Sequence, residues 1–227
     1  FPTRRSSDLF NNKIFCFSTI TSMIIMLSMV GPALLIPLYV QNALGLSALL
    51  SGLVIMPGAI INGIMSVFTG KFYDKYGPRP LIFTGFILLI SCTFLLCFLK
   101  VDTSYTYLIV IYAIRMFAVS LLMMPINTTG INALKTEDIS HGTAIMNFGR
   151  VMAGSLGTAL MVTFMSIGAQ WVVSSSEHAS KEMIQRQSVA VGVDVSFALV
   201  TVFVIIAFVL ALFIKEPNHL THNSRKV

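Results

Sequence analysis

Charge is the scarcest property of this chain. Only 11% of its 227 residues are Asp, Glu, Lys or Arg, whereas 56% are hydrophobic. Soluble domains average about 25% charged residues, and a water-soluble globule cannot bury this much apolar surface. A soluble enzyme, a secreted disulfide domain and a disordered tail are therefore excluded, and the composition predicts a protein that folds in a lipid bilayer.

Cysteine is scarce as well. Cys16, Cys92 and Cys97 all lie inside apolar runs without CxxC or zinc-ligand spacing, so we expect them to pack as small apolar residues and predict no metal site. The net charge is +6, but the basic residues are spread over segments between apolar runs and form no patch for nucleic acid. A phosphate-binding glycine loop is also missing, so neither direct use of ATP nor a bound cofactor is predicted.

Long apolar runs dominate what is present. A helix needs roughly 20 apolar residues to cross a bilayer, and none of the runs alternates as barrel strands do. The sequence therefore predicts an all-α membrane protein with a six-helix transmembrane bundle over residues 11–215 and a tail over 216–227. Residues 1–10 resemble a translated sequencing-adapter scar or a twin-arginine signal, and are left out of the fold. The predicted spans are Ile14–Val40, Ala48–Gly70, Pro80–Leu99, Tyr105–Ile126, Thr143–Ala169 and Val193–Ile214. A solvated connector is predicted over Gln170–Gly192, with a short surface helix over Glu177–Gln187 as the alternative.

The basic residues between the spans are distributed unequally. One side holds Lys13, Lys71, Lys75, Arg79, Lys135, Lys215, Arg225 and Lys226, whereas the other holds Lys100, Lys181 and Arg186. Because basic residues are retained on the cytoplasmic side, this bias predicts that both termini are cytoplasmic.

Two runs carry polar stripes at helical spacing. Asn62 and Ser66 share a face of the second run with Gly70, and the fifth run places Asn147, Arg150, Gly154 and Gly157 on one side. Small residues four apart allow helices to approach closely. We interpret Asn62, Ser66, Asn147, Arg150, Gly154 and Gly157 as helix-interface residues. Ordinary packing of the glycines, and snorkelling of Arg150 to the membrane surface, are the alternatives.

A charged residue also lies deep in the fourth run. Arg115 is ten residues from Tyr105 and ten from Pro125, which is about 15 Å from either end of the run. A charge at that depth requires a wet cavity or a partner. We predict a substrate cavity lined by Ser22, Met26, Met29, Tyr112 and Arg115. An interhelical bond of Arg115 and simple packing of the methionines are the alternatives.

A charged motif joins the second and third runs. It comprises Gly70, Asp74, Lys75, Gly77 and Arg79, with Lys71 and Pro78 between them. Asp74 is surrounded by basic residues with which it can form ion pairs, and Gly77 with Pro78 favours a turn. We predict a loop that acts as a conformational latch.

This motif resembles the G-x-x-x-D-R-x-G-R-[RK] signature of the major facilitator superfamily. Lys75 replaces an arginine of that pattern, and Pro78 replaces a second basic residue. Three segments are similar to those of fourteen-span drug:proton antiporters, multidrug exporters of the lincomycin-resistance type: GLVIMPGAIINGIMSVFTGKFYDKYGPRPL, IYAIRMFAVSLLMMP and HGTAIMNFGRVMAGSLGTAL. The resemblance extends over about residues 11–215 and is to the C-terminal half of these proteins.

The resemblance implies one half of a major facilitator fold. The first and fourth helices would line a central cavity, the second and fifth would flank it, and the third and sixth would support it from outside. It also implies export of amphipathic small molecules by alternating access across the bacterial cytoplasmic membrane, driven by the proton motive force. The partner would be an N-terminal half of six to eight spans.

No acidic residue lies near the middle of a predicted span. The nine are Asp8, Asp74, Asp102, Glu137, Asp138, Glu177, Glu182, Asp194 and Glu216. A proton carrier is therefore expected in the companion half. The alternatives are a self-contained six-span homodimeric transporter and a structural or receptor protein of the membrane. Enzyme activity is not predicted, because GxSG, HExxH and a mid-span aspartate pair are missing.

Overall fold

The computed structural model describes residues 12–175 and 181–214, so the predicted N-terminal segment 1–10 and tail 216–227 lie outside the described residues. The described part contains helices and no strand. In chain order these are α1 (Lys13–Asn42), α2 (Ala48–Tyr76), α3 (Pro78–Leu95), α4 (Tyr105–Asn132), the 3₁₀ turn η2 (Thr136–Asp138), α5 (Ile139–Ser175) and α6 (Lys181–Leu212). Six of them are long and apolar enough to cross a membrane, which confirms the predicted fold class.

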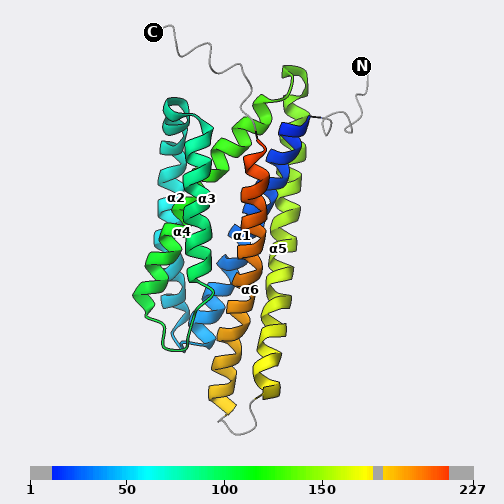
Figure 1. The fold of residues 1–227 in the computed structure, drawn as a ribbon. Helices are drawn as coiled ribbons and strands as arrows, with labels where there is room; N and C mark the ends of the chain where they lie inside the picture. Colours follow the sequence, from blue (N-terminus) through cyan, green and yellow to red (C-terminus); the bar gives the residue numbers. More distant parts are fainter. Residues whose placement is uncertain (1–11, 176–180, 215–227) are drawn as a thin grey trace.

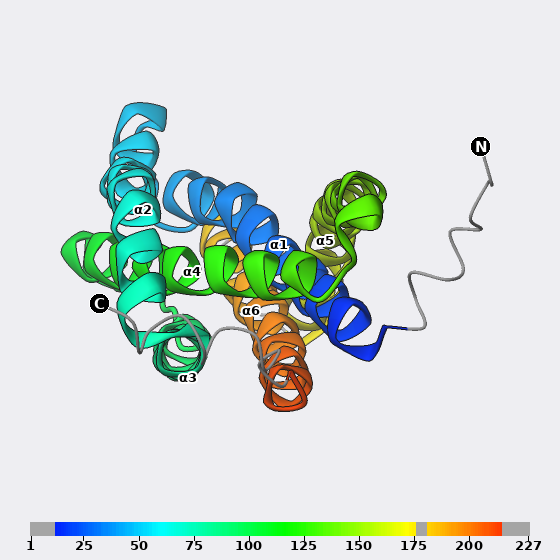
Figure 2. The ribbon, with the colours of Figure 1, turned by 90° about the horizontal axis from the view of Figure 1, so that it is seen from above.

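The helices are arranged around α1 and α4. Figure 1 shows that the start of α1, the α2–α3 junction, the α4–α5 connection and the end of α6 lie at one end of the bundle, which we call the junction end. Seen from above, α1 and α4 lie between α2 and α5, and α3 and α6 lie together on one side (Figure 2). We call the opposite side, bounded by α2 and α5, the concave face.

Helix ends at the junction end are held by specific contacts. The Asn12 side chain accepts hydrogen bonds from the N–H groups of Ile14 and Phe15 at 3.1 and 3.3 Å, which caps α1. The same side chain donates to the carbonyl of Ala133 at 2.6 Å, which joins the start of α1 to the end of α4. One asparagine thus fixes the register of the two central helices.

Glycines allow α5 to pack closely on its neighbours. A Cβ on Gly157 would lie 2.8 Å from Leu27 Cγ and 3.0 Å from the Leu27 backbone of α1. A Cβ on Gly192 would overlap the Met165 carbonyl oxygen, so α6 also approaches α5 closely. Within lipid such contacts supply van der Waals attraction between helices in place of a hydrophobic driving force.

The fifth and sixth helices extend beyond their predicted ends. α5 continues to Ser175 and α6 begins at Lys181, twelve residues before the predicted Val193. The prediction of a solvated connector over Gln170–Gly192 is therefore wrong for most of that segment. Glu, Lys, Gln and Arg are good helix formers, and Arg186 pairs with Glu182 one turn away at 3.0 Å. Polarity alone does not end a helix that packs against a neighbour.

Candidate functional site

The concave face contains a cavity of about 410 Å³. It is lined by Met26 and Met29 of α1, Asn62 and Ser66 of α2, Val119, Ser120, Met123, Met124, Asn127 and Thr128 of α4, and Arg150 of α5. Two of the predicted substrate-cavity residues, Met26 and Met29, thus line this cavity. Three of the predicted interface residues line it as well: Asn62, Ser66 and Arg150. α3 and α6 contribute nothing to this lining.

Two polar groups of the lining have no partner within the described chain. They are Oδ1 of Asn127, an acceptor, and Nε of Arg150, a donor, and both atoms are buried. Buried polar atoms normally form hydrogen bonds, so these two groups are suited to bind water or a polar part of a ligand. Asn62, in contrast, donates to the Met116 carbonyl at 3.1 Å and joins α2 to α4.

Four methionines make up much of the apolar lining. They are Met26, Met29, Met123 and Met124. Unbranched, polarisable thioethers adapt to apolar molecules of different shape. The α4 members of the lining were not among the residues predicted from the sequence. Their signal was the spacing of Ser120, Met123, Met124 and Asn127, which places them on one side of a helix.

Arg115 lies elsewhere, in the interior between α1 and α4. Its side chain is 0% exposed and its Nη2 donates to the Ser28 carbonyl of α1. In a helix that carbonyl would accept from the N–H four residues later, but residue 32 is a proline and has no N–H. Arg115 therefore supplies the hydrogen bond that Pro32 removes. This contact is the interhelical bond that the sequence analysis gave as the alternative.

Ser22 and Tyr112 also lie away from the cavity. The Ser22 hydroxyl donates to the Thr19 carbonyl within α1 at 3.0 Å. The Tyr112 ring packs against Gly58 of α2, where a Cβ would come within 2.8 Å of it. Three of the five predicted cavity residues, Ser22, Tyr112 and Arg115, are therefore outside the cavity lining.

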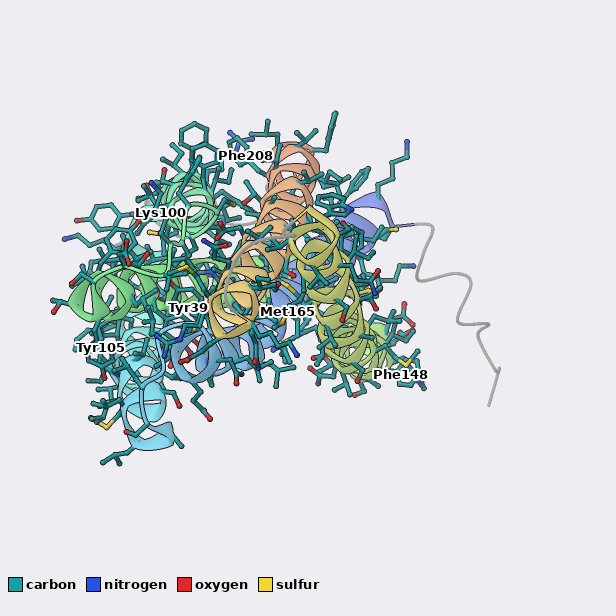
Figure 3. The ribbon with its side chains drawn as sticks, turned by 90° about the horizontal axis from the view of Figure 1, so that it is seen from below. Tyr39, Lys100, Tyr105, Phe148, Met165 and Phe208 are labelled. Carbon is teal, nitrogen blue, oxygen red and sulfur yellow. The ribbon has the colours of Figure 1, made fainter. Side chains whose placement is uncertain are left out.

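The predicted interface stripe of α5 divides between two environments. Gly157 packs on Leu27, and a Cβ on Gly154 would lie 3.4 Å from Val30, so both glycines face α1 of the same chain. Asn147 is exposed. Its neighbour Phe148 is 69% exposed and lies at the periphery of the bundle in the view from below (Figure 3).

The predicted latch motif is mostly helical. Gly70, Asp74 and Lys75 belong to α2, Arg79 lies in the first turn of α3, and Gly77 alone separates the two helices. Gly77 has φ 78°, a conformation that favours glycine, and its N–H closes α2 on the Tyr73 carbonyl at 2.9 Å. The predicted turn is thus confirmed, whereas the seven residues before it form a helix and not a loop.

The predicted charge network of this motif is not formed within the described residues. Asp74 is exposed and makes no ion pair there. Lys75 instead lies 5.1 Å from the centre of the Tyr76 ring, and Lys71 lies 5.7 Å from that of Phe68. Asp74 is therefore free to pair with a group outside the described chain.

Comparison with known proteins identifies the family. The sequence pattern of the Major Facilitator Superfamily matches residues 1–158, well over half of the chain. The chain belongs to the Major Facilitator Superfamily. It is 35% identical over 210 residues to the lincomycin resistance protein LmrB of Listeria monocytogenes. The matched segment covers 92% of this chain and 44% of that protein. It is 43% identical over 155 residues to the MFS-type transporter YhcA of Bacillus subtilis, covering 68% of this chain and 29% of that protein. The chain spans less than half the length of these relatives.

The superfamily match and the six apolar helices identify a multi-pass bacterial membrane protein. The roles implied for its helices agree with the structure, because α1, α2, α4 and α5 supply the cavity wall while α3 and α6 lie on the other side (Figure 2). Superfamily membership, expected from the sequence motifs, is thus confirmed.

The acidic residues that the structure describes do not line the cavity. Asp194 is thirteen residues inside α6. Its carboxylate accepts a hydrogen bond from the Leu99 N–H at 3.0 Å, so it is bound outside the cavity. Leu99 belongs to the α3–α4 connection, at the end opposite the junction end, where Tyr39 also donates to the Lys100 carbonyl at 2.5 Å. Within the described chain no carboxylate lines the cavity.

Proposed function

We propose that this chain is the C-terminal half of a proton-coupled multidrug efflux transporter, which exports amphipathic small molecules by alternating access. The cavity of the concave face carries the proposal. Its methionines suit varied apolar groups, and its unpartnered Asn127 and Arg150 atoms suit a polar group on the same molecule. Two relatives are named as lincomycin resistance proteins, which agrees with export of such molecules.

The exposed faces of α2 and α5 support a missing companion half. Only 17% of the most apolar part of α2 is buried, against 61% for α4. The two flanking helices expose large apolar side chains: Ile60, Ile64, Val67 and Phe68 on α2, and Phe148, Val151, Met152 and Leu156 on α5. A companion half of six to eight helices would cover them and close the cavity, which by itself has walls from one side only.

The proposal also includes the transporter's coupling to protons and its orientation in the membrane. Because no carboxylate of the described residues lines the cavity, the proton-carrying residue would belong to the companion half. The excess of basic residues at the junction end supports a cytoplasmic position for that end and for both termini. Gly70, Asp74, Lys75, Gly77 and Arg79 would form a cytoplasmic latch, in which Asp74 pairs with a basic group of the other half when the cytoplasmic side is closed.

Efflux by the complete transporter tests this function. Arg150→Ala removes the cavity donor, and Arg186→Ala, at the other end, is the charge-matched control. A hydrogen bond to a charged group contributes about 1.5–3 kcal/mol, so we expect Arg150→Ala to slow efflux of lincomycin or ethidium at least about tenfold. Arg150→Lys should keep part of the rate, and Arg186→Ala should keep nearly all of it. Equal efflux by Arg150→Ala and wild type, at equal membrane levels, would contradict the proposal.

A further inference from the structure

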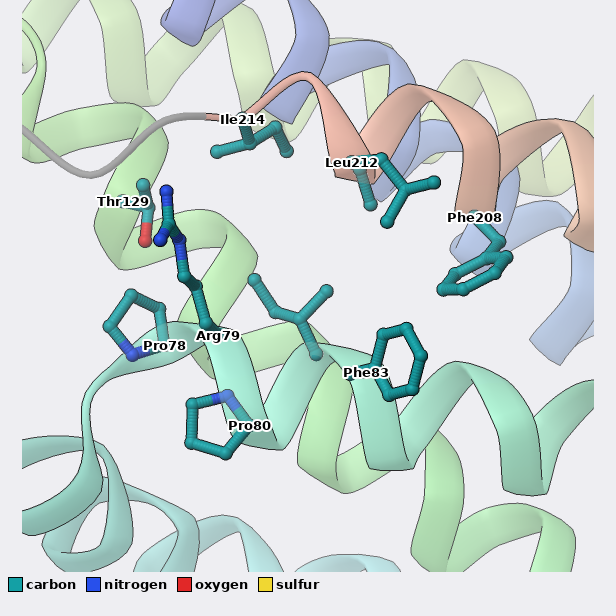
Figure 4. Close-up of a pocket in the computed structure, with 10 residues that line it drawn as sticks. Pro78, Arg79, Pro80, Phe83, Thr129, Phe208, Leu212 and Ile214 are labelled. Atoms are coloured by element: carbon teal, nitrogen blue, oxygen red, sulfur yellow. The ribbon is translucent and has the colours of Figure 1, made fainter.

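A second cavity lies on the side of the bundle away from the concave face, between α3 and α6 at the junction end. Its volume is about 420 Å³ (Figure 4). It is lined by Pro78, Arg79, Pro80, Ile82 and Phe83 of α3, Thr129 of α4, Phe208, Ala211 and Leu212 of α6, and Ile214. It shares no residue with the cavity of the concave face, so it requires a separate explanation.

Most of this cavity is apolar and open to the surroundings of the bundle. Phe83 and Phe208 pack against each other at the end of the lining away from Arg79, with ring centres 5.5 Å apart. Phe83 is 51% exposed and Leu212 is 59% exposed. In a membrane-spanning bundle these outer faces of α3 and α6 are in contact with lipid, so the cavity is a cleft that an acyl chain can enter from the bilayer.

The junction-end limit of the cleft is polar and positively charged. Arg79 and Thr129 both line this end, and in Figure 4 the Arg79 side chain points toward Thr129. Arg79 forms no ion pair within the described chain. Thr129 is 1% exposed, and its hydroxyl has no hydrogen-bond partner among the described residues. Among the described residues, no carboxylate is part of the lining. A cation and an unpaired hydroxyl thus meet at the end of an apolar cleft.

The start of α3 adds to this positive potential. Gly77 at its N-cap has no side chain, and no side-chain cap is present. Pro78 and Pro80 have no N–H, so the N–H of Arg79 is the free donor of the first turn. The N-terminus of a helix favours negative charge, and it lies next to the Arg79 side chain.

We propose that this cleft binds an anionic glycerophospholipid. One acyl chain lies along the apolar lining that Phe83, Phe208 and Leu212 form, and the phosphate accepts hydrogen bonds from the Arg79 guanidinium and the Thr129 hydroxyl. An anionic lipid is favoured over a zwitterionic one because the described residues of the site offer positive charge and donors but no acidic group for an ammonium. The lipid would join α3 to α6 from outside the bundle.

Native mass spectrometry of the full chain in mild detergent tests this site, with phosphatidylglycerol and phosphatidylcholine as probes. We expect one phosphatidylglycerol to bind at least about tenfold more tightly than phosphatidylcholine. Arg79→Ala should weaken phosphatidylglycerol binding about tenfold, corresponding to about 1.4 kcal/mol, and Thr129→Val about two- to threefold. Lys75→Ala, a charge-matched change at the same end but outside the cleft, should leave binding within about twofold.

Two results would overturn the proposal. One is equal binding of the two lipids by wild type, and the other is unchanged phosphatidylglycerol binding by Arg79→Ala. If Arg79→Ala does not give a monodisperse protein, Arg79→Lys and Thr129→Val decide: both should bind more weakly than wild type, and wild-type affinity in both contradicts the site. A photoreactive phosphatidylglycerol with its reactive group in the acyl chain should label peptides of α3 and α6. Labelling only of other helices counts against the cleft.

Discussion

At the scale of single residues, Arg115 shows how a charged side chain can be structural in a membrane helix. It lies in the middle of α4, and its guanidinium donates to a carbonyl of α1 that Pro32 leaves without its helical donor. Pro32 removes one backbone hydrogen bond of α1, and Arg115 of the neighbouring helix donates a hydrogen bond to the same carbonyl. The two residues, 83 positions apart, therefore act as a pair.

This pairing predicts a coupled effect on stability. Arg115→Ala leaves the buried Ser28 carbonyl without a donor, so we expect a loss of about 1–3 kcal/mol. Pro32→Ala restores a backbone donor for that carbonyl, so the double variant should lose less than Arg115→Ala does. Thermal unfolding of the four proteins of this cycle in detergent measures the coupling. Strictly additive losses would show that Arg115 does not act through the Ser28 carbonyl.

At the scale of helices, the contact between α1 and α5 depends on small residues. Gly157 faces Leu27, and Gly154 faces Val30 one turn away. The sequence predicted close packing from this spacing, but it did not show which helix was the partner. The structure assigns both glycines to α1 of the same chain, while the exposed side of α5 carries Asn147 and Phe148.

Two alanine substitutions separate packing from helix propensity. Gly157→Ala would place its Cβ 2.8 Å from Leu27 Cγ and 3.0 Å from the Leu27 backbone, so α5 must shift. We expect a loss of about 1–3 kcal/mol in thermal unfolding experiments. Gly63→Ala is the control, because a Cβ there meets nothing within 4 Å, and it should stabilise the helix by up to about 1 kcal/mol. Similar effects of the two changes would refute a packing role for Gly157.

At the scale of the whole molecule, the concave face is the surface that the proposed companion half would cover. The described chain leaves large apolar side chains exposed on α2 and α5, the two helices that flank the cavity. The lipid-facing helices α3 and α6 expose apolar side chains too, so exposure by itself does not separate lipid from protein contact. The cavity with its polar lining marks the concave face as the one that a companion half would cover.

Cysteine labelling distinguishes the two faces. In a variant with Cys16, Cys92 and Cys97 replaced by alanine, Phe148→Cys on α5 and Phe94→Cys on α3 each add one exposed thiol. In the complete transporter we expect a membrane-permeant maleimide to label Phe148→Cys about tenfold more slowly than in this chain alone. Labelling of Phe94→Cys should be equal in both. Equal labelling at both positions would contradict a companion half on this face, and disulfide dimers of Phe148→Cys with transport by this chain alone would favour the homodimer.

The sequence by itself determined the class of the fold and the family. Six apolar runs of helical length leave little choice of structure in a bilayer, and the motif around Gly77 keeps its turn because φ 78° favours glycine. These features depend on local composition and spacing, which can be read along the chain. The helical continuation of α2 through Tyr76 and the long α6 were missed, because charged residues also form good helices.

Only the tertiary structure decided which polar groups meet. Arg115 and Arg150 look alike in the sequence, since each is an arginine in an apolar run. Packing buries Arg115 against α1 and places Arg150 in the cavity wall with Asn62 and Met26. Their partners come from helices many residues away, so spacing along one helix gives the face of a residue but not what that face touches. Contacts between distant helices are set by how all six pack together.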